Sequence, residues 1–84
     1  MFLEVVSAEY IREYIVKVTF NTGESKLVDL KDSLKGPVFE LLKDQEFFKH
    51  FSIHYNTLEW KNGADFAPEY LYRVGKTLEP SLEV

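Results

Sequence analysis

The sequence predicts an α+β domain with a mainly antiparallel sheet of about five strands and two or three short helices on one face. Two observations predict this class. Apolar and polar residues alternate at 14–20 and again at 51–60, as in strands with one buried face. Between these segments, and after Pro68, apolar residues recur at helical spacing and prolines mark helix starts. The expected element order is β-β-β-α-α-β-β-α.

The N-terminal third predicts three strands. The clearest covers residues 14–20, in which every second residue is apolar. Residues 21–24 then form a turn, because Gly23 tolerates positive φ without steric cost. A second strand follows at 26–30, and so short a polar loop predicts an antiparallel hairpin. Residues 3–8 are expected to add a further strand.

The middle of the chain changes to a helical period. Pro37 is expected to open a helix, since its fixed φ suits the first turn and its missing N–H is not needed there. The apolar residues of 38–42 then share one helical face. Asp44 is expected to cap a second short helix through residues 46–49.

The last third returns to strand pattern. Strands at 51–55 and 58–60 are expected to form a second hairpin, followed by an irregular loop at 62–65. Pro68 opens a last short helix that carries Tyr70, Leu71 and Val74. Residues 1–73 are therefore expected to form a single domain. Residues 74–84 are expected to form a frayed C-terminal tail, because they have no clear period.

Composition narrows the class of protein. Seven Phe, five Tyr and one Trp supply large apolar side chains for one core, and the absence of cysteine excludes disulfides and Cys-based zinc sites. No apolar stretch approaches the roughly 20 residues of a membrane span, and the first residues lack a basic leader region. We therefore expect a cytoplasmic protein without membrane partners. The net charge of −4 repels phosphate backbones, so no direct nucleic-acid partner is expected.

The candidate catalytic groups are few. His50 and His54 are four residues apart, but a strand is expected to begin at 51, which places His50 at a helix end and His54 on a solvent-facing strand face. Asp65 is expected to bond to the backbone of its own turn rather than to a cation. No catalytic, cofactor-binding or metal site is predicted. A small hydrolase remains an alternative only if Asp65 and a histidine share one pocket.

Four large rings are concentrated near the C-terminal end of the domain. Trp60, Phe66, Tyr70 and Tyr72 lie within thirteen residues. One strand and one short helix can bury only part of them, and partly exposed Tyr and Trp are enriched at protein interfaces. They therefore form a candidate interaction surface. The alternative is that Trp60 and Tyr70 close the bottom of the core.

Several segments resemble, in order and spacing, the bacterial family known as domain of unknown function 2442. They are residues 36–40, 42–44, 58–60, 62–65, 67–68 and 71–72, with 18–20, 23–24 and 28–30 fitting its opening hairpin. The resemblance covers about residues 5–73 and implies an α+β domain whose biochemical role is not established. Gln45 and Lys61 depart from the family pattern, which often has proline there.

The resemblance also identifies motif positions. They are occupied by Gly36, Pro37, Trp60, Asn62, Gly63 and Asp65. Gly, Pro and Asn-Gly are equally the residues that tight turns require, so a structural and a functional role both stay open. Some family members resemble a fusion to a C-terminal helix-turn-helix, for which this chain is expected to be too short. Members also tend to be encoded beside a second small protein, in an arrangement similar to a toxin–antitoxin pair.

These observations favour a non-enzymatic protein–protein interaction module, such as an antitoxin-like partner of a second small protein. The alternative is a regulatory domain that acts on DNA through a partner or as a dimer. A homodimer is a further expectation, because an edge strand and surplus aromatic residues both favour pairing.

Overall fold

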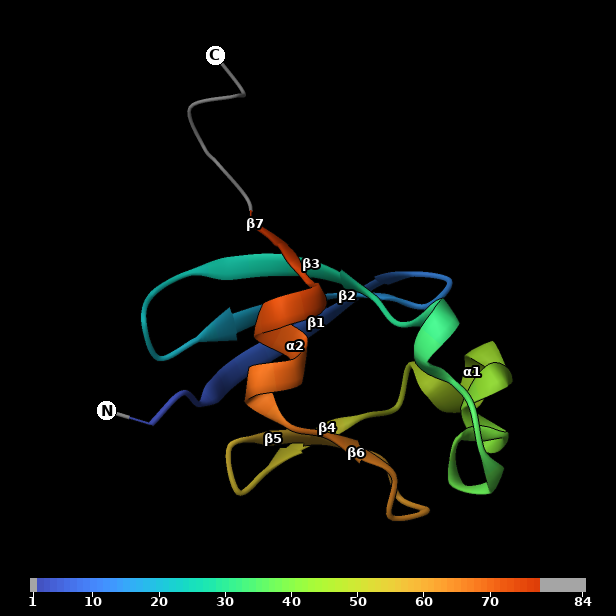
Figure 1. Ribbon diagram of the computed structural model, residues 1–84. Helices are drawn as coiled ribbons and strands as arrows, with labels where there is room; N and C mark the ends of the chain where they lie inside the picture. Colours follow the sequence, from blue (N-terminus) through green and yellow to red (C-terminus); the bar gives the residue numbers. More distant parts are fainter. Residues whose placement is uncertain (1, 78–84) are drawn as a thin grey trace.

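Two antiparallel sheets build the protein, and the single five-stranded sheet expected from the sequence is wrong (Figure 1). The computed structural model describes residues 2–77. Sheet A has the strand order β1-β2-β3-β7, and sheet B has the order β4-β5-β6. The predicted α+β class and antiparallel pairing are confirmed. Two sheets form because each hairpin has one apolar face, and packing one face against the other buries both.

Sheet A contains the three predicted N-terminal strands. They are β1 (Val5–Arg12), β2 (Ile15–Phe20) and β3 (Ser25–Asp29). Burial alternates regularly in β2 and β3, so β2 buries Val16, Val18 and Phe20 on one face and leaves the residues between them half-buried. This inner face of sheet A forms one wall of the core.

The fourth strand of sheet A comes from the expected tail. Lys76 and Thr77 form β7 and pair with Leu27 and Lys26. Gly75 permits this pairing, because a Cβ there would lie 2.9 Å from each of three atoms: Leu71 O, Lys26 Cβ and Val28 Cγ2. The sequence pattern missed β7 because two residues are too few to show a period. The other residues of the expected tail, 78–84, lie outside the described residues.

The first expected helix is instead a pair of 3₁₀ turns at Pro37–Phe39 and Leu41–Lys43, preceded by a third at Lys31–Ser33. The 3₁₀ geometry aligns side chains three residues apart. Consequently Val38 and Leu41 both face solvent, while Phe39 and Leu42 face the core.

The second expected helix is confirmed as α1 (Gln45–Phe48). The Asp44 side chain caps it, as predicted, by accepting a hydrogen bond from Glu46 N at 2.9 Å. Phe48 is buried at the last turn of this helix. The cap therefore fixes where α1 starts, and the buried Phe48 fixes which side of it faces the core.

Sheet B consists of β4 (Ser52–His54), β5 (Thr57–Glu59) and β6 (Asp65–Phe66). The turn between β4 and β5 is Tyr55-Asn56, one residue earlier than the expected Asn56-Thr57. Both turn residues have positive φ, 53° and 61°, as a type I′ hairpin requires. Part of the expected loop at 62–65 is thus strand, since Asp65 begins β6.

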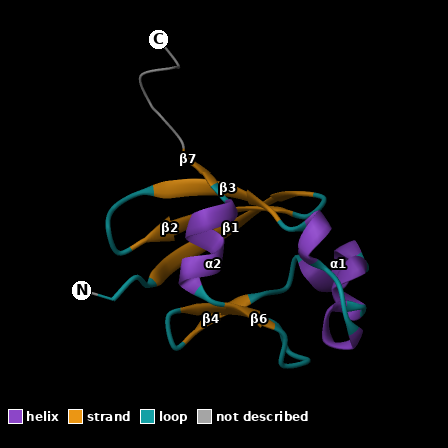
Figure 2. Cartoon of the chain, in the orientation of Figure 1, coloured by secondary structure: helices purple, strands orange, loops and turns teal. Residues whose placement is uncertain are grey.

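Helix α2 (Pro68–Val74) connects sheet B to β7. Figure 2 shows this helix crossing from one sheet to the other, with α1 and the 3₁₀ turns grouped at one side. Between them, Trp60 is 2% exposed and Leu58 and Leu71 are fully buried. The core is therefore closed by sheet A, sheet B and α2 together.

Gly75→Ala should destabilise the fold, because its Cβ would meet backbone and side-chain atoms that cannot move independently. We expect a loss of about 1–3 kcal/mol in the free energy of unfolding, as for other overpacked sites. Urea unfolding followed by circular dichroism measures it. Lys76→Ala, at the exposed neighbouring position, is the matched control. An unchanged urea midpoint in Gly75→Ala would contradict this account of β7.

Candidate functional site

The two motif segments at 36–38 and 60–64 lie together, joined by Asn62. Its Nδ2 donates to Val38 O at 2.9 Å, and its Oδ1 accepts from Ala64 N at 3.2 Å. Within the second segment, Trp60 N donates to Ala64 O at 2.8 Å and Gly63 N to Trp60 O at 3.0 Å. Gly63 has a φ of 92°, which favours glycine. Asn62 and Gly63 therefore shape a turn and tie it to Pro37–Phe39.

The aromatic residues of the candidate surface are stacked into the core. Phe66 packs between Phe39 and Tyr70, with centroid distances of 4.9 and 5.5 Å, and meets Trp60 edge-on at 5.8 Å. Trp60 and Phe66 are buried, whereas Tyr70 is half-buried and its hydroxyl bonds to Ser33 Oγ. These rings hold the core together, and Trp60 and Phe66 offer almost no exposed surface to a partner.

Tyr72 links α2 to β3 through a polar cluster. Its hydroxyl donates to Glu24 Oε1 at 2.6 Å, and Lys26 Nζ donates to the Tyr72 carbonyl at 2.8 Å while lying 3.6 Å from the ring centroid. The hydrogen bond from Tyr72, aided by one from Thr22, lowers the pKa of Glu24. The same bond, with burial, raises the pKa of Tyr72. Both shifts favour the charged carboxylate and the neutral phenol.

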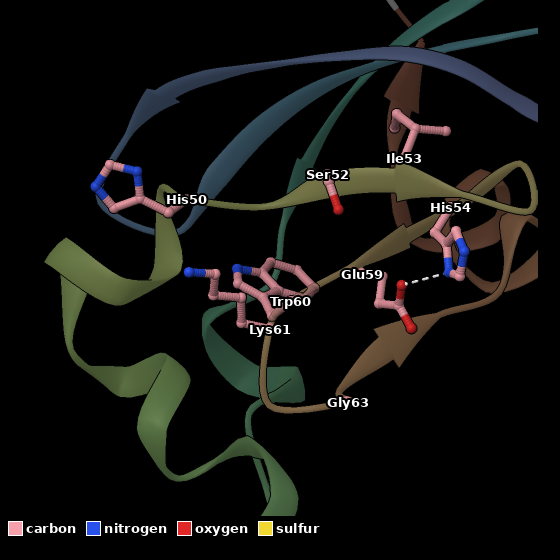
Figure 3. Close-up of a pocket in the computed structure, with 8 residues that line it drawn as sticks. All are labelled: His50, Ser52, Ile53, His54, Glu59, Trp60, Lys61 and Gly63. Atoms are coloured by element: carbon pink, nitrogen blue, oxygen red, sulfur yellow. Dashed lines mark ion pairs between the residues drawn. The ribbon is translucent and has the colours of Figure 1, made fainter.

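The outer face of sheet B carries an open concavity of about 460 Å³ (Figure 3). Its one ion pair joins His54 Nδ1 to Glu59 Oε1 at 2.8 Å. Both side chains are partly exposed. The lining residues are His50, Ser52, Ile53, His54, Glu59, Trp60, Lys61 and Gly63.

The hydrolase alternative requires Asp65 and a histidine in one pocket. Asp65 is the cross-strand neighbour of Glu59, yet it is not among the residues that line the concavity. His54 pairs with Glu59 instead, and Figure 3 places His50 at the opposite end of the group. Between residues 2 and 77, no group of three or more His, Asp or Glu side chains could hold a metal ion. A general base must lie within hydrogen-bond reach of the group that it deprotonates, so the His54–Glu59 pair alone does not define a reaction.

Sequence reasoning missed the most exposed aromatic residues. Tyr55 and Phe2 are each 87% exposed. The Tyr55 ring packs against His54 in a tilted arrangement, with a centroid distance of 4.3 Å and an interplanar angle of 37°. Val5 N donates to Asn56 O at 3.0 Å, which attaches the hairpin tip to the start of β1. The strand period placed Tyr55 within a strand. The Asn at position 56 was the available signal, since asparagine is typical of type I′ turns.

These features define a small α+β domain in which two antiparallel sheets enclose an aromatic core. The chain belongs to the family described as "Protein of unknown function (DUF2442)", whose model matches residues 5–77. No curated protein and no solved structure gives a significant match. None of the helices in the described part of the chain is long and apolar enough to cross a membrane.

Asn62→Asp should weaken the fold although it only replaces the side-chain amide NH₂ with a carboxylate oxygen. The carboxylate can still accept from Ala64 N, but it cannot donate to Val38 O and would repel that carbonyl. We expect a loss of about 1–2 kcal/mol in unfolding free energy, measured by urea titration. Lys61→Ala, the exposed neighbour, is the control. Equal midpoints for Asn62→Asp and the parent protein would show that the amide donor is dispensable.

The Tyr72–Glu24 bond predicts a pH-dependent contribution to stability. The pKa of Glu24 is lowered from 4.5, so its contribution is present above about that pH and is lost as the pH falls through the folded value. The pKa of Tyr72 is raised from 10.0, so its contribution is present below that pH and is lost as the pH rises through the folded value.

The melting temperature of Tyr72→Phe should therefore fall below that of the parent protein mainly between these two limits. The difference should shrink in acid below pH 4.5 and in alkali above pH 10.0. Tyr55→Phe, which removes a hydroxyl from a residue that is 87% exposed, is the control. A difference that is constant from acid to alkali would contradict the assigned bond.

Proposed function

We propose that the protein is a non-enzymatic interaction module that binds a second small protein through the tip of the β4–β5 hairpin and the adjacent N-terminal segment. The observation that carries the proposal is the exposure of Tyr55 and Phe2, each at 87%. The bond from Val5 N to Asn56 O holds these two segments together. Large exposed rings of this kind are enriched at the centres of protein interfaces.

The backbone at Tyr55 supports a functional role for this ring. A non-glycine residue with positive φ is destabilised by roughly 1–2 kcal/mol, and a bulky residue there is a genuine outlier. Tyr55 has a φ of 53°, whereas asparagine or glycine would relieve the strain. Strained residues that persist at exposed positions are typical of binding sites.

The ring is also held in place before binding. The Tyr55 ring packs against the His54 ring, and His54 Nδ1 lies 2.8 Å from Glu59 Oε1. A ring that is already oriented loses less conformational entropy when a partner covers it. This arrangement favours Tyr55 as the anchor of the interface.

Charge suggests the chemistry of the partner. The net charge of −4 favours association with a basic protein, because opposite fields accelerate encounter and disfavour wrong partners. A complementary surface would be an apolar pocket flanked by Lys or Arg side chains. An antitoxin-like complex with a small protein encoded beside this one, as the family resemblance implies, fits that description.

Tyr55→Asn separates stability from binding. We expect the variant to be about 1 kcal/mol more stable, because asparagine tolerates this backbone, and to bind the small protein encoded beside it at least tenfold more weakly. Thermal unfolding and isothermal titration measure the two effects. Leu41→Asn, at a 49% exposed apolar position in the 3₁₀ turn Leu41–Lys43, is the control for binding.

Two results would contradict the proposal. One is unchanged affinity in Tyr55→Asn. The other is an absence of binding by the parent protein to its neighbour-encoded protein at concentrations where weak complexes form, about 0.1–1 mM.

A further inference from the structure

The open edge of sheet A is β1. The strand order β1-β2-β3-β7 leaves this eight-residue strand at one edge and the two-residue β7 at the other. Beyond the strand ladders of residues 2–77, the backbone of β1 makes one bond, from Val5 N to Asn56 O. The hairpin tip therefore occupies the first residue of this edge. Strands β4 and β5 lie close to β1, but among the described residues no backbone hydrogen bond occupies the middle of its edge.

The hydrogen-bonding pattern identifies the groups that face this edge. Phe20 N donates to Glu24 O on the β3 side, so every second residue of β2 from Phe20 back to Val16 bonds towards β3. Ala8 and Tyr10 lie opposite members of this set. Their own N–H and C=O groups therefore point away from β2, into the open edge.

We infer that a second copy of the chain pairs with this edge, antiparallel, about a two-fold axis at Glu9. In this register Ala8 of each copy lies opposite Tyr10 of the other, and each pair exchanges N–H and C=O groups. Sheet A and its symmetry mate then form one continuous sheet. This interface is distinct from the hairpin tip, so the inference can be tested independently of the proposed function.

Side-chain volumes fit this register. Ala8 and Tyr10 are both half-buried, and a small residue opposite a large one leaves room for the tyrosine ring. The N-terminal end of β1 also fits this register. Val5 would lie opposite Glu13 of the other copy, which is one residue beyond the end of that copy's β1. Asn56, which already occupies the edge at Val5, is thus not displaced.

Charge makes the pairing weak and reversible. The axis brings the two Glu9 carboxylates together, and like charges directly opposite are unfavourable. Each Glu9 has Lys17 as its cross-strand neighbour on β2, so the row across the interface holds equal numbers of acids and bases. Register irregularities between Val5 and Ser7 and between Tyr10 and Arg12 confine regular pairing to the middle of the strand. These features favour a dimer over open-ended aggregation.

Ala8→Pro tests the pairing directly. It removes an N–H that points away from β2, so the ladder of sheet A is kept, and proline is tolerated at such edge positions. Sedimentation equilibrium should show a concentration-dependent dimer for the parent protein and at least a tenfold weaker one for Ala8→Pro, which loses one donor per copy. Glu9→Thr should strengthen the dimer roughly two- to fivefold, because it removes the facing carboxylates.

If Ala8→Pro fails to fold, amide hydrogen exchange of the parent protein tests the same pairing without a variant. In the parent protein the Ala8 and Tyr10 amides should become protected as concentration rises, while the Ser7 and Glu9 amides, which bond to β2, should be protected throughout. A parent protein that stays monomeric up to about 1 mM would overturn the inference. So would a dimer that Ala8→Pro leaves unchanged, or protection of Ala8 that requires a different protein.

Discussion

The buried indole of Trp60 is the interaction on which the rest of the structure depends. Its Nε1 donates to Phe48 O at 2.6 Å, and its ring lies 5.4 Å from Phe48 and 5.8 Å from Phe66. The bond satisfies both the indole and a carbonyl at the end of α1, which would otherwise be buried without partners. Trp60 therefore fastens sheet B to α1, and with it closes the core against sheet A.

That constraint separates the residues that hold the fold from those available for binding. Asn62 and Gly63 shape the turn after Trp60, and Phe66 and Tyr70 extend the ring stack on its other side. The motif positions are thus largely explained by packing and turn geometry. Tyr55 is different, because a turn would be better served by asparagine and the ring lies in solvent. The surface with the clearest functional signal is consequently one that the motif does not contain.

The sequence predicted the local elements better than their assembly. Alternation found the strands of the first hairpin, and the Asp44 cap located α1. The division into two sheets depends on which apolar face packs against which. The periodicity of apolar residues along one strand carries no information about that choice. β7 depends on the close approach allowed by Gly75, a contact between segments distant in sequence. At the candidate site, composition alone could not show whether Trp60 and Phe66 are buried or exposed. Tyr55 was missed for a different reason, because tyrosine rarely adopts positive φ.

Hydrogen exchange at the Trp60 indole N–H, followed by NMR, tests the central claim most directly. If this group joins sheet B to α1 inside the core, it should exchange only through global unfolding, with the same free energy of opening as the slowest backbone amides of β2. Exchange at the rate of an exposed indole, while those β2 amides remain protected, would contradict a core organised around Trp60.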